Sequence, residues 1–351
     1  MKITGPVRIV WVDDDVEGRT KDAKNLMFKE KKLRVSVVHP SNFDEYFETK
    51  TLSAPDDVDL FLIDYKLNEV GLDDEQKYPK LGLTIAGTIR EKLPDHPIYA
   101  TSAGTATSIV PENAISAAEA VFDRIVSTKA IINNEKRVLL LDALYFKRIK
   151  NVRRNDVEAL LGLLMPPHES IAQLKLILPS ELRDGLGESG NSTRNAVSFA
   201  RWTTRTLLQI PGFLYDRLHA ATYLGTTAES LRRNEMKLKA ARYEGVFSET
   251  AQPLWWRQGL ERVVYSSRKI SQTGVMSSTR LGPMVLEIKR GFSRCAVCGA
   301  RYPETVASRS SDVEDLRAVH IRCSWPDPKM KNELFFDEYR AFGLKTDLPE
   351  G

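Results

Sequence analysis

Three consecutive carboxylates, Asp13 to Asp15, stand at the point where a hydrophobic run ends. Neighbouring carboxylates repel one another, so crowding them beside a buried segment is unfavourable unless a cation or a proton neutralises them. The preceding run VRIVWV, residues 7–12, is apolar apart from one arginine, which is typical of a strand buried on both faces of a parallel sheet. The sequence therefore predicts a cation site at the carboxyl end of this strand.

A second group of residues with metal-binding chemistry lies far along the chain. Cys295 and Cys298 form a C-x₂-C pair, and His320 and Cys323 follow after 21 intervening residues. Two close pairs of soft or borderline ligands suit tetrahedral zinc, and they use every cysteine of the chain. Since no position remains for a catalytic water, Zn²⁺ is predicted to be structural. The pattern resembles a zinc knuckle or treble clef at its ligands alone; the alternative is a chance spacing with His320 on the surface.

Four further apolar segments repeat the pattern of the first strand, at residues 33–38, 58–64, 97–102 and 120–126. Between them lie stretches with helical patterns, at residues 16–30, 42–50, 82–93 and in a segment that ends near residue 120. Five alternating strand and helix units predict a doubly wound α/β sheet. In such sheets ligands bind at the carboxyl ends of the strands, which is where the first acids stand.

Several of the other strands also end in polar residues. Asp64 ends the third strand, Thr101 and Ser102 end the fourth, and the fifth runs into Thr128 and Lys129. Acids, a hydroxyl and a lysine at one sheet edge suit phosphoryl transfer to a carboxylate. The acids would hold Mg²⁺ through oxygen and one carboxylate would attack phosphorus, while the hydroxyl and the ammonium would hold the remaining phosphoryl oxygens.

This order of strand-end residues resembles the receiver domain of two-component response regulators, a flavodoxin-like (βα)5 fold, over residues 1 to about 130. The resemblance implies that Asp64 is the phosphoacceptor and that Asp13 and Asp14 place Mg²⁺. It also implies that the backbone carbonyl of Lys66 completes the protein ligands of the metal.

Two further roles and a partner follow from the same resemblance. Ser102, which Ala103 follows, occupies the position of the family's hydroxyl, with Thr101 as a close competitor. Lys129 occupies the position of the family's lysine. A histidine kinase or a phosphotransfer protein is then expected to donate the phosphate.

The chain departs from the family's pattern around this site. The proline expected four residues after the phosphoacceptor is Asn68, and a long connection follows it. Ala130 replaces the proline after the lysine, and Val126 stands where an aromatic switch residue is expected. We therefore expect phosphorylation to be signalled by another route, such as the long connection.

Composition and length favour a multidomain cytoplasmic protein. The chain has 351 residues, of which 42% are hydrophobic, which is enough for two or three domains with their own cores. The first residues become acidic too soon for a signal peptide, and no run approaches ~18 apolar residues, so we expect no membrane segment. An odd number of cysteines argues against a disulfide scaffold.

Charge and helical patterning divide the chain into three predicted parts. Residues 1–130 hold 17 Lys and Arg against 22 Asp and Glu, whereas the remainder holds 34 against 25. The excess of positive charge permits nucleic-acid binding without requiring it. We predict a receiver at 1–130, a mainly α-helical domain at 131–290, and a small zinc-stapled C-terminal module at 291–351.

The predicted helical domain carries no recognised catalytic motif. Helical patterns cover residues 130–155, a segment that opens with Asn155 and Glu158 as a capping pair, and residues 196–210, 226–245 and 254–270. GLGESGNS, residues 185–192, has the spacing of a nucleotide-binding loop, but Asn191 stands at its lysine position, so a connection between helices is the better interpretation. Trp255 and Trp256 are interpreted as core residues rather than a stacking platform.

These observations predict a response-regulator-like signal transduction protein in which phosphorylation of Asp64 controls the helical part. Two alternatives stay open: a phosphorylation-controlled nucleic-acid-binding effector, and an enzymatic effector with an unrecognised site between helices. A homodimer is also left open.

Overall fold

The computed structural model describes residues 5–43, 45, 58–65, 67, 82–102, 121–152, 156–183, 192–266, 276–309, 312–327 and 338–342. The chain forms two compact units, one made of residues 1–160 with 179–202 and the other of 161–178 with 203–351. These units differ in extent from the three parts predicted from the sequence, whose boundaries at residues 130 and 290 remain predictions.

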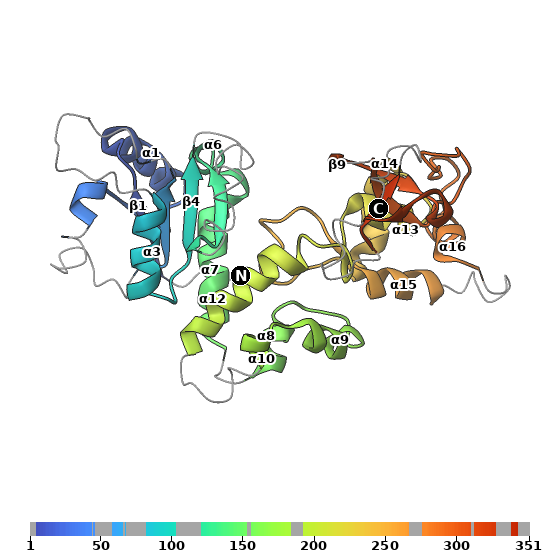
Figure 1. The fold of residues 1–351 in the computed structure, drawn as a ribbon, viewed down its shortest axis with the longest axis horizontal. Helices are drawn as coiled ribbons and strands as arrows, with labels where there is room; N and C mark the ends of the chain where they lie inside the picture. Colours follow the sequence, from blue (N-terminus) through green and yellow to red (C-terminus); the bar gives the residue numbers. More distant parts are fainter. Residues whose placement is uncertain are drawn as a thin grey trace, which may run out of the picture. The chain divides into compact units, whose positions relative to one another are not determined.

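A parallel sheet of five strands forms the centre of the first unit (Figure 1). Its strands are β1 (Val7–Val12), β2 (Leu33–Val38), β3 (Leu60–Asp64), β4 (Ile98–Ser102) and β5 (Arg124–Ser127). They lie in the order β2-β1-β3-β4-β5, and every pair is parallel. This order is that of the flavodoxin-like doubly wound fold and confirms the predicted class.

Helices cover both faces of this sheet, which is why its central strands are apolar on both sides. The helices of the first unit include α1 (Val16–Lys29), α3 (Gly82–Lys92), α6 (Thr128–Ile132), α7 (Val138–Lys150) and α12 (Ser192–Trp202). Ile85 and Ile89 of α3 share a core cluster with Ala100 of β4. Tyr99, which points to the opposite face, contacts Phe146 of α7 with ring centroids 6.5 Å apart.

The second unit begins with short helices around a buried aromatic core. Its elements include α9 (Ser170–Ile177), α13 (Arg217–Tyr223), α14 (Ala228–Arg233), α15 (Arg257–Tyr265) and α16 (Ser278–Val285). Strand β6 (Leu214–Tyr215) pairs with β7 (Trp255–Trp256), and both tryptophans are buried. The interpretation of these tryptophans as core residues is confirmed.

A four-stranded sheet carries the predicted zinc ligands. Its strands are β8 (Thr305–Arg309), β9 (Asp312–Val319), β10 (Trp325–Pro326) and β11 (Arg340–Phe342), in the order β10-β11-β8-β9. A short 3-10 helix, η8 (Ile321–Cys323), follows β9. Cys295, Ala307, Val319 and Phe342 form the small core of this sheet.

Three predicted helices are wrong in their extent. The helix predicted at 130–155 is interrupted between α6 and α7, where Asn134 and Arg137 adopt positive φ angles of 56° and 51°. The helix predicted at 226–245 ends as α14 and continues as a 3-10 helix, η6 (Glu235–Ala241), and Thr227 caps it rather than Thr226. The helix predicted from 254 begins only at Arg257, because the two tryptophans pair with β6.

Other sequence predictions are placed as follows. The helix predicted at 196–210 is α12 followed by a π-helix, η5 (Thr203–Leu207). The helix start predicted at Asn155 is capped by Asp156, whose Oδ1 accepts a hydrogen bond from the Ala159 N–H at 2.8 Å. The predicted helix at 42–50 lies mostly outside the described residues, and the one ending near residue 120 and the loop at 185–191 lie wholly outside them. No helix in the described ranges is long and apolar enough to cross a membrane.

Candidate functional site

Three carboxylates meet at the carboxyl edge of the parallel sheet. Asp13 and Asp14 follow β1, and Asp64 ends β3, the strand that pairs directly with β1. One oxygen from each carboxylate lies within 4.8 Å of the others. Oxygen ligands this close together are the set that Mg²⁺ prefers in proteins, so the donor chemistry of this acidic cluster fits the ion.

The third carboxylate of the WVDDD run has a different task. Asp15 caps α1, because its Oδ1 accepts a hydrogen bond from the Gly18 N–H at 2.9 Å. Its own N–H donates to Asp13 Oδ1 at 3.0 Å and to Asp14 Oδ1 at 3.2 Å. The start of α1 therefore fixes the orientation of the two acids that face Asp64.

Arg19 is a functional neighbour that the sequence reasoning missed. Its Nε donates to Asp13 Oδ2 at 3.0 Å, and its Nη1 donates to Asp22 at 2.7 Å. Burial raises the pKa of Asp13 to about 6 and Asp64 adds to the rise, while the Arg19 guanidinium opposes it. The carboxylates of Asp13, Asp14 and Asp64 lie close enough to repel one another, and a cation would relieve that repulsion. The available signal was the placement of Arg19 in the first turns of α1.

The structure places some of the remaining predicted site residues at the same edge. The backbone of Ser102 ends β4, but its side chain and Lys66 lie outside the described residues. Thr101 is buried and its hydroxyl is hydrogen-bonded to that of Thr128 at 2.7 Å. Lys129 is exposed in the first turn of α6, and no contact of its ammonium with Asp64 is seen in the described ranges.

The backbone of Asp64 is in close contact with the first residue of α3. A Cβ atom at Gly82 would lie 2.1 Å from the carbonyl oxygen of Asp64, which is closer than such atoms ever approach. Gly82 therefore allows α3 to pack directly against the end of β3 and sets the height of Asp64 at the sheet edge.

We expect Gly82→Ala to destabilise the first unit by about 1–3 kcal/mol, because the added methyl group must displace α3 or the end of β3. Gly87, in the same helix, is the matched control: a Cβ there meets nothing within 4 Å. Gly87→Ala should stabilise the protein by about 0.5–1 kcal/mol, because alanine favours the helix. Urea unfolding measures both changes, and equal effects of the two substitutions would contradict this role of Gly82.

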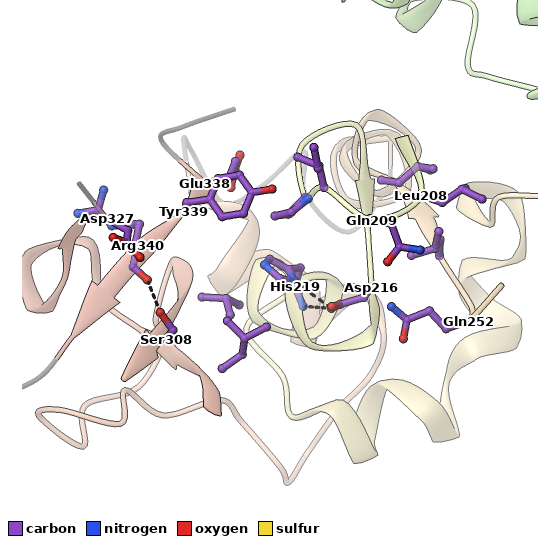
Figure 2. A pocket seen from close by; sticks show the side chains of 16 residues that line it. Leu208, Gln209, Asp216, His219, Gln252, Ser308, Asp327, Glu338, Tyr339 and Arg340 are labelled. Atoms are coloured by element: carbon purple, nitrogen blue, oxygen red, sulfur yellow. Dashed lines mark hydrogen bonds and ion pairs between the residues drawn. The ribbon is translucent and has the colours of Figure 1, made fainter. Parts of the chain in front are cut away.

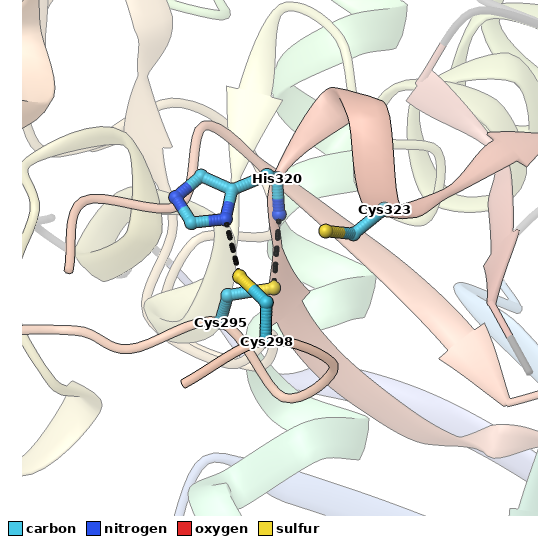
Figure 3. Close-up of side chains that lie close together, drawn as sticks. All are labelled: Cys295, Cys298, His320 and Cys323. Atoms are coloured by element: carbon cyan, nitrogen blue, oxygen red, sulfur yellow. Dashed lines mark hydrogen bonds between the residues drawn. The ribbon is translucent and has the colours of Figure 1, made fainter. Parts of the chain in front are cut away.

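The second candidate site is the cluster of Cys295, Cys298, His320 and Cys323 (Figure 3). One ligand atom from each residue lies within 4.8 Å of all the others. A tetrahedral zinc ion with Zn–S near ~2.3 Å and Zn–N near ~2.0–2.1 Å would place its ligand atoms roughly 3.5–3.8 Å apart. Three sulfurs and one imidazole fit zinc in both chemistry and spacing.

The hydrogen bonds of His320 make its Nδ1 the ring atom that is available to bind a metal. Nε2 lies 3.2 Å from the carbonyl oxygen of Arg301, and Nδ1 lies 3.3 Å from Cys298 Sγ. Because a carbonyl can only accept, Nε2 carries the hydrogen in the neutral ring and Nδ1 presents its lone pair. This orientation by a carbonyl is the usual arrangement of a metal-binding histidine.

Backbone N–H groups favour a thiolate at Cys295. Burial acts against ionisation, but hydrogen bonds from the N–H groups of Cys298, His320 and Val297 lower the pKa of Cys295 to about 6. Burial and the two neighbouring cysteines raise the pKa of Cys323 to about 11. Three thiolates so close together need a cation, since each additional charge raises the cost of the next.

A third feature is a cavity of about 190 Å³ in the second unit (Figure 2). Its walls are mainly apolar, and Asp216 and His219 of α13 lie on one side, with His219 Nδ1 2.9 Å from Asp216 Oδ1. Burial opposes ionisation of Asp216, yet the hydrogen bonds from His219 lower its pKa. Asp216 also caps α13, which explains the pair structurally. The sequence reasoning missed this pair, whose only signal was the three-residue spacing.

Comparisons with known proteins found similar solved structures, each of which covers part of this chain. No protein-family model and no curated protein match the chain. Similar solved structures include a response regulator receiver domain protein from Clostridium thermocellum, with 17% identity over 38% of this chain and 98% of that one and a TM-score of 0.25. A CheY-like receiver domain protein from Methanospirillum hungatei JF-1 has 16% identity over 38% and 94%, with a TM-score of 0.27. The signal receiver domain of an HD domain-containing protein from Pseudomonas fluorescens Pf-5 has 15% identity over 44% and 97%, with a TM-score of 0.32.

Proposed function

We propose that this protein is a response-regulator-like signalling protein whose Asp64 accepts a phosphoryl group in a Mg²⁺-dependent reaction. The observation that carries the proposal is the meeting of Asp13, Asp14 and Asp64 at the carboxyl edge of neighbouring parallel strands. Carboxylates this close together repel one another, and a bound cation gives a reason to gather them at one point.

The chemistry assigns one task to each group. A carboxylate oxygen of Asp64 attacks phosphorus, the bond from phosphorus to the leaving oxygen or nitrogen breaks, and an acyl phosphate forms. Mg²⁺ supplies neutralising charge when it is bound by the acids and the backbone carbonyl of Lys66. The Ser102 hydroxyl and the Lys129 ammonium hold the oxygens of the transferred group, and Lys129 is exposed and so able to turn toward it.

The proposal extends to the donor and to the location of the protein. A histidine kinase or a phosphotransfer protein donates the phosphoryl group in the cytoplasm. The phosphorylated receiver then changes its contacts with the remainder of the chain or with a second copy. In the C-terminal module, Cys295, Cys298, His320 and Cys323 hold a structural Zn²⁺, because their donor set and mutual spacing suit that ion.

The test is phosphorylation of the full chain by acetyl phosphate. With Mg²⁺ present, we expect mass spectrometry of the intact protein to show one added phosphoryl group, which chelation of Mg²⁺ removes. Asp64→Asn should abolish the modification, because an amide is not a nucleophile toward phosphorus at neutral pH.

The matched control is Asp15→Asn in the same acidic run. Asparagine is as good a helix cap as aspartate, and Asp15 binds the Gly18 N–H rather than facing Asp64. This variant should therefore be phosphorylated normally. Phosphorylation that persists in Asp64→Asn, or that ignores Mg²⁺, would disprove the proposed role of the acidic cluster.

A further inference from the structure

Three arginines that lie close together in the second unit form no ion pair within the described ranges. Ten arginines in the described part of the chain pair with a carboxylate, namely Arg19, Arg90, Arg124, Arg137, Arg201, Arg217, Arg233, Arg257, Arg262 and Arg317. Across the same ranges, no carboxylate pairs with Arg280, Arg301 or Arg322. These three belong to different segments: α16, the loop after the C-x₂-C pair, and η8.

All three unpaired arginines line one polar cavity of about 560 Å³. The remaining walls are formed by Met276, Ser277, Thr279, Ala300, Tyr302, Glu304 and His320. Among the described residues that line this arginine-lined cavity, Glu304 is the one acid, and its Oε2 accepts a hydrogen bond from the Ile321 N–H at 3.2 Å. Three guanidinium groups against one carboxylate leave the cavity with net positive charge.

Guanidinium groups gathered around a hollow repel one another and retain unused N–H donors. An anion bound in the cavity would offset the repulsion between the guanidinium groups. It would also use their N–H donors, since each guanidinium can donate two parallel hydrogen bonds to phosphate oxygens. The hydroxyls of Ser277 and Thr279, which lie 2.8 Å apart, add neutral donors at the same wall. The wall chemistry therefore selects an oxyanion, and phosphate fits its geometry best.

We propose that this arginine-lined cavity binds the phosphodiester backbone of a single-stranded nucleic acid. Its volume exceeds what one phosphate needs, and the arginines come from three separate segments, as contacts to successive phosphates require. Aromatic rings lie beside them: Tyr302 lines the cavity and contacts Phe292 with centroids 6.2 Å apart. Such rings are platforms on which unpaired bases stack.

The backbone holds Tyr302 in place at some cost. Its φ angle is +64°, a conformation that a bulky side chain rarely adopts. Residues held in such conformations concentrate at binding sites. The neighbouring Arg301 guanidinium lies 5.0 Å from the centroid of the Phe292 ring, so charge and aromatic surface are presented together.

The metal cluster of the C-terminal module positions two of the three arginines. The carbonyl of Arg301 is bonded to His320 Nε2 at 3.2 Å, and Arg322 lies in η8 between two of the proposed zinc ligands. Removal of the metal should therefore move these two arginines away from the cavity. Phosphorylation of Asp64 takes no part in this inference, so either proposal can fail without the other.

The test is fluorescence anisotropy of the zinc-loaded full chain with labelled 20-nucleotide single-stranded DNA and RNA. We expect binding that weakens with salt, with a log–log slope near −2 for three phosphate contacts at about −0.7 each. The triple variant Arg280→Ala, Arg301→Ala, Arg322→Ala should lose most of this slope and bind about tenfold or more weakly at low salt. Zinc content, measured by elemental analysis, verifies that the module remains folded.

Two further variants separate charge from folding. Arg280 lies on α16, outside the metal-binding segments. Arg280→Ala alone should weaken oligonucleotide binding several-fold. Arg233→Ala is the control, because Arg233 is also exposed in the second unit but pairs with Glu229 on α14. It should bind as tightly as the unmodified chain.

Several outcomes would overturn the proposal. One is a triple variant that keeps its zinc and binds as tightly as the unmodified chain. Another is displacement of the oligonucleotide by inorganic phosphate at matched concentration, which would assign the cavity to a small phosphate ligand. Stronger binding of the duplex, or equal binding of a phosphoserine peptide, would equally exclude a single-stranded nucleic acid as its partner.

Discussion

Replacing Cys298 with serine is expected to release the metal and unfold the four-stranded sheet of the C-terminal module. Structural zinc contributes on the order of 10 kcal/mol to the folding of such small modules at neutral pH. Within the described ranges, the core cluster of this sheet consists of Cys295, Ala307, Val319 and Phe342, with Cys323 packed against it. A core so small cannot offset the chain entropy of the four strands without the metal.

The measurements are elemental analysis and limited proteolysis. The unmodified protein should carry one zinc per chain and resist cleavage between residues 291 and 323. Cys298→Ser should lose the zinc and become cleavable there, and a strong chelator should do the same to the unmodified protein. The five-stranded sheet should persist, because it belongs to the first compact unit and all four ligand residues belong to the second.

The matched control is Val297→Ser in the same loop. Val297 is adjacent to Cys298 and half exposed, so serine there changes the loop without removing a ligand. This variant should retain zinc and resist protease as the unmodified chain does. A zinc-free native protein, or Cys298→Ser protein with full zinc and an intact module, would show that the cluster is not a metal site.

The strands of the parallel sheet were predictable because their environment is simple. The interior strand β1 is buried along most of its length, so it needs apolar residues at nearly every position and the run at 7–12 matches it. The run at 33–38 matches β2, an edge strand whose Arg34 is exposed. The run at 120–126 misplaces β5, which begins at Arg124. Phe122 extends the apolar run but precedes the strand. The acidic Asp123 also precedes it, and its burial depends on arginines from distant segments that the sequence does not reveal.

The helix predictions were wrong where tertiary contacts overrode the local hydrophobic pattern. Trp255 and Trp256 have the spacing of a helical face, yet they pair with Leu214 and Tyr215, about forty residues earlier in the chain. The break before α7 requires positive φ angles at Asn134 and Arg137, and arginine gives no signal for that conformation. Propensity is a weak guide wherever such long-range contacts decide.

In the candidate sites, too, some residues could be predicted from the sequence and others could not. Strand topology places Asp13 and Asp64 at one edge, and ligand spacing reveals the cysteine cluster, so both could be predicted from the sequence. Arg19 and Gly82 could not, because their roles depend on how α1 and α3 approach the sheet. The carbonyl of Arg301, which orients His320, is invisible to any motif because it belongs to the backbone.

A second large effect, a loss of folding stability, is expected from substitution of Asp123, just before β5. Its side chain is 2% exposed and accepts hydrogen bonds from Arg90 and from the Ile98 N–H, each at 2.7 Å, and from Arg201 of α12. Burial lowers the pKa of Arg90 and the nearby Arg201 lowers it further, while Asp123 opposes both. The buried carboxylate of Asp123 thus offsets the electrostatic repulsion between Arg90 and Arg201.

We expect Asp123→Ala to destabilise the first unit by about 3–5 kcal/mol, because it leaves buried charges without their counterion. Urea unfolding measures the loss, and Glu17→Ala is the control. Glu17 also pairs with a cation, Lys21, but its side chain is 87% exposed, so its removal should cost about 0.5 kcal/mol or less. A loss at Asp123 no larger than that at Glu17 would contradict the buried role.

A double substitution tests whether Asp123 secures α12 to the sheet. In the unmodified chain, Arg201→Ala removes two hydrogen bonds, one to Asp123 and one to the Val121 carbonyl at 2.9 Å, and should be destabilising. In the Asp123→Ala background, Arg201 has lost its counterion and faces Arg90, so the same substitution should cost less or even stabilise. The difference between the two costs is the coupling energy, and a value near zero would mean that packing against α7 holds α12 without help from this ion pair.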